Sequence, residues 1–286
     1  MKKDLIVIGA GPCGATAAIY AKRAGLDVLV IDSGASALLK ADKIENYYGF
    51  ESVSGKELFE KGLMQLRRLK VETVFRQALS AVYGDGFVIK TYGKEYESTA
   101  LLIASGAKRT KPPAQEFESY LGRGASYCAV CDGFFFRGKD VGVIGAGEYA
   151  LSEARELARM CKSVCILTDG AKPEADFSEF SVNTGKITGI EGKDSIEAVI
   201  LDDKKIKLSG LFAAVGVAGA ADFARRIGAQ VKGADIVVND KFETNVPGLY
   251  AAGDCIFGIK QIGTAVDHAG FQKSGFFGAD FYDDVR

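Results

Sequence analysis

The fold is decided by a stretch that occurs twice, Asp4-Leu-Ile-Val-Ile-Gly-Ala-Gly-Pro-Cys-Gly14 and Asp140-Val-Gly-Val-Ile-Gly-Ala-Gly-Glu-Tyr-Ala150. In each copy an apolar run enters a glycine turn, a helical pattern of about 12 residues follows, and a second apolar run closes the unit. These second runs are Val28–Asp32 and Val164–Thr168. A strand, a crossover helix and a second strand require a parallel sheet. The repeat therefore predicts an α/β protein with two Rossmann-like, doubly wound, three-layer domains.

The spacing of the copies predicts that the first domain is discontinuous. We expect residues 1–111 to form its first part, 112–239 to form the second domain, and 240–286 to close the first. The basic, proline-containing segment 108–113 is typical of a linker. Alternating apolar residues between Leu79 and Thr99 predict antiparallel strands. A further buried strand is expected in Gly248–Asp254, where an apolar run ends in Gly-Asp.

Composition excludes several classes of protein. The 286 residues include 36 basic and 37 acidic side chains, and a formal charge of −1 gives no bulk attraction to nucleic acid or an anionic membrane. No apolar run reaches the ~18 residues that a bilayer crossing needs. Six cysteines contain one close pair, so a disulfide framework is disfavoured and a reducing cytoplasm is favoured.

The first glycine turn indicates a dinucleotide site. Gly9 permits the tight turn, Gly11 lets backbone approach a pyrophosphate, and Gly14 lets the helix pack on the strand. Asp32 ends the next strand, where a carboxylate can accept hydrogen bonds from both ribose hydroxyls. The alternative is an ordinary glycine-rich strand–helix turn without a ligand.

The close cysteine pair, Cys128 and Cys131, indicates redox chemistry. Two cysteines three residues apart can close a small disulfide, and nearby N–H groups can stabilise one thiolate. A zinc site is disfavoured because the chain has one histidine and no second Cys-x-x-Cys motif, so no metal is expected. Asp132 follows directly and is positioned to supply or take a proton; the alternative role is a helix N-cap.

Five segments resemble, in order, those of the low-molecular-weight thioredoxin reductases: Gly9-Ala-Gly-Pro-Cys-Gly14, Lys43-Ile-Glu-Asn-Tyr-Tyr-Gly-Phe50, Ala104-Ser-Gly106, Tyr127-Cys-Ala-Val-Cys-Asp-Gly-Phe134 and Val246-Pro-Gly-Leu-Tyr-Ala-Ala-Gly-Asp254. The resemblance covers most of the chain and implies FAD as the cofactor. The residues expected at FAD are Gly9, Gly11, Pro12, Gly14, Asp32, Ser33, Asn46, Ser105, Gly106, Gly253, Asp254, Gln261 and Ile262. Ser105 stands where the family usually has threonine.

The resemblance also implies how the cysteines divide the work. Cys131 would face the flavin and Cys128 would attack the disulfide of thioredoxin or a similar small protein, with Asp132 handling the proton. Members of the family are typically homodimers, so a homodimer is expected here.

The second glycine turn departs from the family. NADPH-dependent members resemble one another in a Gly-x-Gly-x-Ser/Ala-Ala-x-Glu-Glu-Ala turn and a later basic run. This chain has Glu148 and Tyr149 in the turn, Ser152 at the first paired glutamate, and three acids against one lysine in 168–176. A carboxylate at a helix start competes with a pyrophosphate for the same N–H groups. Like charges ~4 Å apart near a protein surface cost about 4 kcal/mol, so we expect NADPH to bind poorly.

Two interpretations of the electron donor remain. NADH could place its ribose on Asp169, or pyridine nucleotide is not used and the second domain is a scaffold for the cysteine pair. The second interpretation is favoured and resembles the ferredoxin-linked flavin thioredoxin reductases. Basic candidates for a ferredoxin surface are Arg67, Arg68 and Lys70, or Lys108, Arg109 and Lys111.

A different class of function, a non-catalytic flavin redox sensor, is a further alternative. Phe281 or Tyr282, in the aromatic tail, could cover a flavin face or pack in the core.

Overall fold

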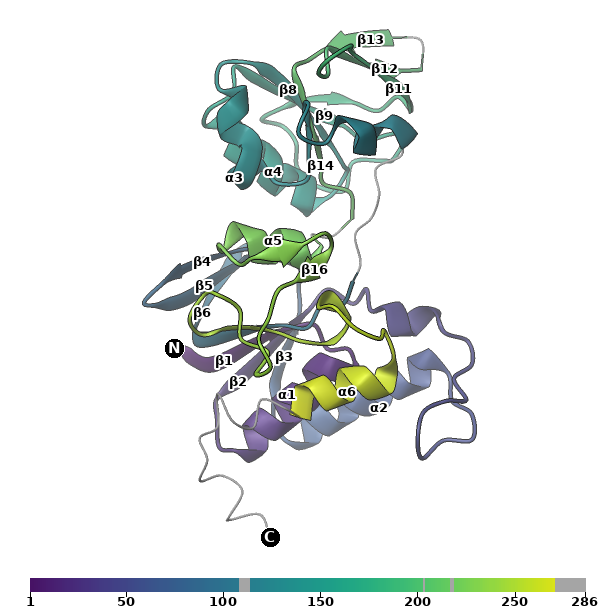
Figure 1. The fold of residues 1–286 in the computed structure, drawn as a ribbon, viewed down its shortest axis with the longest axis vertical. Coiled ribbons are helices and arrows are strands. Elements are labelled where there is room, and N and C mark those ends of the chain that lie inside the picture. Colours follow the sequence, from purple (N-terminus) through teal and green to yellow (C-terminus); the bar gives the residue numbers. More distant parts are fainter. Residues whose placement is uncertain (108–113, 203, 217–218, 271–286) are drawn as a thin grey trace. The chain divides into compact units, whose positions relative to one another are not determined.

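The computed structural model describes residues 1–107, 114–202, 204–216 and 219–270 (Figure 1). The expected linker 108–113 and the aromatic tail with Phe281 and Tyr282 lie outside these residues. The chain divides into two compact units: unit 1 contains Met1–Lys108 and the chain from Gly219 on, and unit 2 is Arg109–Ala218. Within the described residues, no helix combines the length and apolar character needed to cross a membrane.

Unit 1 is built on one seven-stranded sheet with the order β3-β2-β1-β6-β5-β4, and β17 also pairs with β6. Neighbours among β1, β2, β3, β6 and β17 run parallel, and the β4–β5 and β5–β6 pairs are antiparallel, as the alternating pattern predicts. The strands are β1 Lys3–Ile8, β2 Val28–Asp32, β3 Glu72–Phe75, β4 Ala78–Gly84, β5 Gly86–Thr91, β6 Lys94–Ile103 and β17 Leu249–Ala251.

The long strand β6 joins the two halves of this sheet. Its first half pairs with β5, and its apolar second half pairs with both β1 and β17. Leu101, Leu102 and Ile103 are fully buried because both faces of this part of the sheet are covered. The carboxyl ends of β1, β6 and β17 consequently lie side by side.

Helices cover both faces of the unit 1 sheet. On one face, α1 Pro12–Arg23 packs against α2 Gly55–Arg68 and α6 Ile262–Gly270. Small residues of α1, among them Ala17, Ala18 and Ala21, are fully buried and allow this close packing. The other face carries α5 Ala220–Arg226 (Figure 1). The short pair β15 Val231–Lys232 and β16 Asp235–Ile236 follows α5.

Unit 2 repeats the parallel arrangement on a smaller scale. Its main sheet has the order β10-β9-β8-β14-β7 with every pair parallel, and three antiparallel strands form a second sheet. The main strands are β7 Ala125–Ser126, β8 Asp140–Ile144, β9 Ser163–Leu167, β10 Ser181–Asn183 and β14 Gly210–Ala213. The other elements are α3 Ala129–Asp132, α4 Glu148–Ala158, β11 Ile187–Glu191, β12 Ala198–Leu201 and β13 Lys204–Lys207.

The second crossing between the units differs from the expected boundary at residue 239. The chain returns to unit 1 at Gly219, because α5 packs on β4 and places Phe223 and Ala224 in the same core as the unit 1 sheet. The apolar pattern of α5 shows that the helix is buried but not which sheet it covers.

Candidate active site

The glycine turn after β1 is shaped by close backbone approaches at two of its three glycines. Gly9 has φ +106°, and a Cβ there would lie 2.5 Å from the Ala104 carbonyl oxygen. A Cβ on Gly14 would overlap the Gly9 carbonyl oxygen. Gly11 is different, because its Cβ would meet only the Ser36 hydroxyl at 3.7 Å. Gly9 and Gly14 are thus required by the turn itself, whereas Gly11 opens onto free space.

The start of α1 supplies the groups that an anion needs. Gly11 is the N-cap and Pro12 the first helical residue, and no side chain accepts the first-turn N–H groups of this helix. Buried Asp32 lies beside the turn and accepts the Ala10 N–H at 2.5 Å and the Gly34 N–H at 2.6 Å. Ser33 follows it in the chain and is exposed. An open cradle of N–H groups with a carboxylate at its edge fits a nucleotide pyrophosphate and its ribose.

The other residues expected at FAD gather at the same edge of the unit 1 sheet. Ser105 and Gly106 follow β6, Gly253 and Asp254 follow β17, and these strands are neighbours. The Asn46 side-chain amide donates a hydrogen bond to Gln261 Oε1 at 3.0 Å across 215 residues of sequence. Ile262 begins α6 directly after Gln261. The fold therefore brings these positions to one edge of one sheet.

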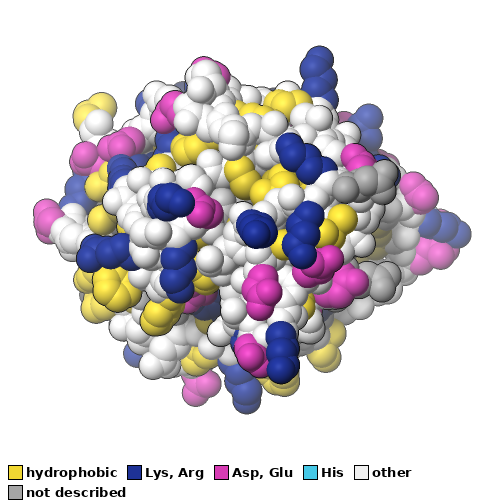
Figure 2. Space-filling model, turned by 90° about the horizontal axis from the view of Figure 1, so that it is seen from above, with side chains coloured by type: hydrophobic (Ala, Val, Ile, Leu, Met, Phe, Trp, Pro, Cys, Tyr) yellow, Lys and Arg dark blue, Asp and Glu magenta, His cyan; other side chains and the backbone are white. Residues whose placement is uncertain are grey.

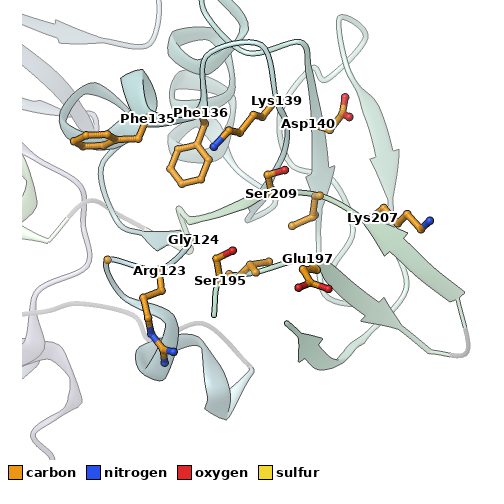
Figure 3. Close-up of a pocket in the computed structure, with 13 residues that line it drawn as sticks. Arg123, Gly124, Phe135, Phe136, Lys139, Asp140, Ser195, Glu197, Lys207 and Ser209 are labelled. Carbon is orange, nitrogen blue, oxygen red and sulfur yellow. The ribbon is translucent and has the colours of Figure 1, made fainter. Parts of the chain in front are cut away.

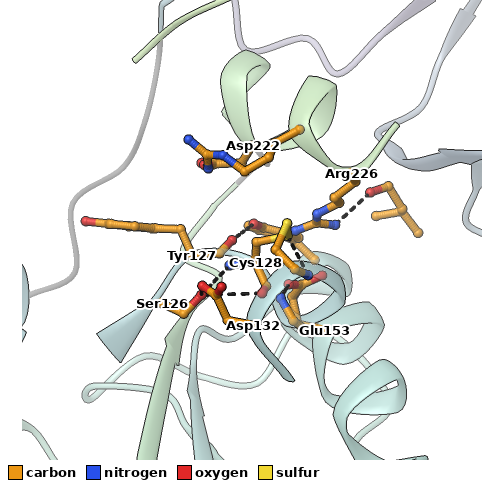
Figure 4. The surroundings of a disulfide bond; sticks show 12 residues. Ser126, Tyr127, Cys128, Asp132, Glu153, Asp222 and Arg226 are labelled. Atoms are coloured by element: carbon orange, nitrogen blue, oxygen red, sulfur yellow. Dashed lines mark hydrogen bonds and ion pairs between the residues drawn. A yellow bond between two sulfur atoms is a disulfide. The ribbon is translucent and has the colours of Figure 1, made fainter. Parts of the chain in front are cut away.

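In unit 2, Cys128 and Cys131 form a disulfide at the carboxyl end of β7 (Figure 4). Cys128 is the N-cap of α3, and its sulfur accepts the Cys131 N–H at 3.2 Å. A sulfur that already accepts an N–H is well placed to carry negative charge after reduction. The other four cysteines, Cys13, Cys161, Cys165 and Cys255, are free thiols.

Asp132 is connected to Cys128 through a serine that sequence reasoning missed. Asp132 Oδ2 accepts a hydrogen bond from the Ser126 hydroxyl at 2.6 Å, and Ser126 Oγ accepts the Cys128 N–H at 3.0 Å (Figure 4). No side-chain capping bond is made by Asp132 at the start of the following helical turn. Asp132 thus has the position of a helix N-cap without a side-chain capping bond, and its carboxylate lies in a hydrogen-bonded network around the disulfide.

Helix α4 contributes two more contacts to the disulfide segment. The Glu153 carboxylate accepts the Ala129 N–H at 2.9 Å, and the Tyr149 hydroxyl donates to the Tyr127 carbonyl at 3.4 Å. Both side chains are buried. Sequence reasoning placed Tyr149 only in the glycine turn and did not single out Glu153. A charged residue on the otherwise apolar face of α4 was the available signal.

The second glycine turn is covered by the chain that follows β9. Gly145 has φ +151°, and a Cβ there would overlap the Ala214 carbonyl oxygen, so the turn keeps its tight shape. The Glu174 N–H donates to the Ala146 carbonyl at 2.7 Å, and the Glu174 carboxylate lies 3.7 Å from the Cβ position of Gly147. The Glu174 carboxylate thus lies beside Gly147, the glycine at which the backbone would approach a pyrophosphate.

Glu148 adds a second negative charge at this turn. It is the first residue of α4 and partly buried, and desolvation raises its carboxyl pKa, with Arg155 opposing and Asp176 adding to the rise. A raised pKa means that the surroundings disfavour negative charge even when it belongs to the protein. A phosphate placed here would meet the same disadvantage.

Asp169, the candidate ribose ligand for NADH, has a structural contact in the protein. Its φ is +53°, and its Oδ1 accepts the Ile187 N–H at 2.8 Å. The side chain thus fastens the loop after β9 to β11.

A pocket of about 490 Å³ lies at the edge of the unit 2 sheet opposite the second glycine turn (Figure 3). It lies where β8 and β14 begin, whereas the glycine turn lies where β8 ends. It is therefore not a dinucleotide site of the expected type. Its charged and aromatic lining residues are Arg123, Phe135, Phe136, Lys139, Asp140, Glu197 and Lys207.

Exposed apolar side chains surround the disulfide segment in sequence. Val130, Phe134 and Phe135 are 53%, 65% and 69% exposed, and the Arg137 guanidinium lies 5.3 Å from the Phe134 ring centre. Exposed aromatic side chains beside a reactive disulfide are suited to contact another protein.

Two nucleotide-type units with a Cys-x-x-Cys disulfide in the second define a disulfide oxidoreductase. Residues 3–269 match the model of the pyridine nucleotide-disulphide oxidoreductases, and the chain belongs to this family, within its thioredoxin reductase group. FAD is the cofactor of these proteins, and the open cradle at Gly11 with Asp32 at its edge fits it.

The chain is similar to the thioredoxin reductase of Listeria innocua, with 32% identity covering 93% of this chain and 90% of the relative. A solved structure of the atypical thioredoxin reductase TRi from Desulfovibrio vulgaris Hildenborough superposes with a TM-score of 0.88, 35% identity and 95% coverage of both chains. The ferredoxin-flavin thioredoxin reductase of Clostridium acetobutylicum gives a TM-score of 0.71, 30% identity and coverage of 94% and 95%.

Proposed function

We propose that this protein is an FAD-dependent thioredoxin reductase whose electron donor is reduced ferredoxin. The observation that carries the choice of donor is the second glycine turn, where Glu148 and Glu174 place carboxylates at the position for a pyrophosphate. The similarity to a ferredoxin-flavin thioredoxin reductase supports the same choice.

The N–H groups at Gly11 and the start of α1 would hold the FAD pyrophosphate, and Asp32 the adenosine ribose. Asn46, Ser105, Gly106, Gly253, Asp254, Gln261 and Ile262 would line the rest of the cofactor. When bound, FAD supplies the two electrons that reduce the Cys128–Cys131 disulfide.

The chain's own residues then complete the exchange. The Cys128 thiolate attacks one sulfur of the substrate disulfide and forms a mixed disulfide, and the other substrate sulfur leaves as a thiol after taking a proton. Cys131 next attacks Cys128, which restores the Cys128–Cys131 disulfide and releases the second substrate thiol. Two electrons pass to the substrate. Asp132, which accepts a hydrogen bond from Ser126 at 2.6 Å, would give and take the protons.

Docking of each partner would use a different surface. Val130, Phe134 and Phe135 offer thioredoxin an apolar contact next to the disulfide. The exposed end of α2 carries Arg67 and Arg68, with Lys70 following, and this cluster would attract an acidic ferredoxin. The second basic candidate, Lys108, Arg109 and Lys111, lies outside the described residues. On the face drawn in Figure 2, basic side chains are interspersed with acidic and apolar ones.

An anaerobic donor assay tests the proposal. We expect the visible absorbance of the oxidised flavin to persist with NADPH or NADH and to bleach with reduced ferredoxin. Thioredoxin should then be reduced by the native protein but not by Cys128→Ser, whose flavin should still bleach. Rapid bleaching by NADPH or NADH would refute the proposed donor.

An NAD(P)H-dependent thioredoxin reductase is the alternative, favoured by the two glycines that remain in the second turn, Gly145 and Gly147. A non-catalytic flavin sensor would bleach without sustained reduction of thioredoxin. We further propose a cytoplasmic homodimer, which sedimentation of the FAD-loaded protein tests: a monomer at micromolar concentration would contradict it.

A further inference from the structure

Helix α4 supports the redox disulfide directly. In a dinucleotide-binding unit the helix after the glycine turn serves the cofactor phosphates, and here its start is occupied by Glu148. Tyr149 and Glu153 lie four residues apart and therefore on one face of α4. Their side chains reach the Tyr127 carbonyl and the Ala129 amide, on either side of Cys128. The same helix thus holds the backbone before and after the reactive cysteine.

The Glu153 contact matters most because it is made by a buried carboxylate. Glu153 is 1% exposed and accepts the Ala129 N–H at 2.9 Å. A second N–H of this segment, that of Cys131, donates a hydrogen bond to the Cys128 sulfur at 3.2 Å. One N–H beside the disulfide therefore serves Glu153, and the Glu153 carboxylate contacts the backbone of the residue directly after Cys128.

We infer that Glu153 is a positioning residue that fixes the start of α3 and, through its negative charge, makes the reduced form of the Cys128–Cys131 pair less favourable. A less stable reduced form makes a dithiol a stronger reductant. The inference rests on the proposed function for its use, since a pair that reduces thioredoxin must give up its electrons readily.

The test measures the redox equilibrium of the pair in the FAD-loaded, full-length protein. Each variant is equilibrated anaerobically at pH 7 with mixtures of reduced and oxidised dithiothreitol. Dithiothreitol supplies both electrons and two protons as the Cys128–Cys131 bond breaks, and becomes its own cyclic disulfide. Alkylation and mass spectrometry of the peptide with both cysteines then give the reduced fraction.

Glu153→Gln keeps an oxygen acceptor for Ala129 and removes the charge. We expect the equilibrium constant for reduction to rise about tenfold, which corresponds to a potential about 30 mV less negative. Glu156→Gln is the matched control on the same helix, because the Glu156 carboxylate pairs with Arg159 at 2.8 Å. Its equilibrium should stay within about twofold of native. A folded Glu153→Gln protein with a native equilibrium would overturn the inference.

Glu153→Asp keeps the carboxylate but shortens the side chain by one methylene. This variant tests the inference if Glu153→Gln does not fold. A near-native equilibrium supports the role of charge, whereas a tenfold rise would show that charge is not the cause. The measurement needs neither ferredoxin nor thioredoxin. A shifted equilibrium without turnover of thioredoxin would refute only the proposed function, and turnover with an unshifted equilibrium would refute only the role of Glu153.

Discussion

Replacing Gly11 with alanine separates the cofactor role of the first turn from its structural role. A Cβ at Gly11 meets only the Ser36 hydroxyl, at 3.7 Å, which is ordinary contact. The folded protein without FAD should therefore tolerate Gly11→Ala. In the FAD-bound protein the added methyl group would push the pyrophosphate away from the N–H groups at the start of α1. Loss of two hydrogen bonds to a charged group, at about 1.5 kcal/mol each, gives about 3 kcal/mol. FAD should bind ~100-fold more weakly.

The assay titrates FAD into protein stripped of cofactor and follows quenching of flavin fluorescence, with thermal unfolding of the cofactor-free protein measured alongside. Gly62→Ala is the control, because Gly62 lies within α2 and its Cβ would meet only Ala15 Cβ at 3.8 Å. That variant should bind FAD normally and gain about 0.5–1 kcal/mol of stability. FAD affinity of Gly11→Ala within threefold of native would show that the pyrophosphate does not lie against this turn.

Three further predictions concern unit 2 and the buried thiols. Glu148→Gln should raise the unfolding temperature at pH 7 by an amount worth less than about 1 kcal/mol. In the folded protein the Glu148 carboxyl has a pKa above its ordinary value of 4.5, so the native protein loses stability as the pH rises from 4.5 through this raised pKa. The gain from Glu148→Gln should therefore vanish below pH 4.5. A gain that persists at that low pH would contradict the reasoning. Ser126→Ala removes the hydroxyl that holds Asp132, and kcat for thioredoxin should fall about tenfold, a part of what general acid–base catalysis contributes; an unchanged kcat would exclude the network from catalysis. Burial raises the thiol pKa of Cys165 to about 11 and of Cys255 to about 12, so peptide mass spectrometry should find both unmodified by iodoacetamide at pH 8 while the reduced redox pair is labelled.

Apolar runs and glycine turns in the sequence predicted those strands and turns whose conformation is determined by residues close by in the chain. The strand Val28–Asp32 has the predicted bounds, and Gly9 forms the expected tight turn, with a φ of +106°, because apolar runs and glycine turns are set within a few residues. The disulfide followed from the spacing of its cysteines. These features required no knowledge of distant contacts.

Features that depend on distant contacts were not predictable in the same way. The bond from Glu153 to Ala129 spans 24 residues, and only the docking of α4 against α3 makes it possible. The placement of Glu174 beside Gly147 depends on how the loop after β9 folds back. The sequence predicted an excess of acids in that loop, but not which acid reaches the glycine.

The pairing of β17 with β6 also governs how the protein can be made. About 150 residues of chain separate the two strands, and the whole of unit 2 lies between them. At about 5–20 residues per second, a ribosome needs roughly 7–30 s to produce β17 after β6 has been made. During that interval the nascent sheet has an open edge at β6, and Gly253, Asp254 and Gln261 do not yet exist. A product truncated before β17 would therefore lack residues of the proposed flavin site, and retention of the yellow cofactor would then report that translation had reached the last strand.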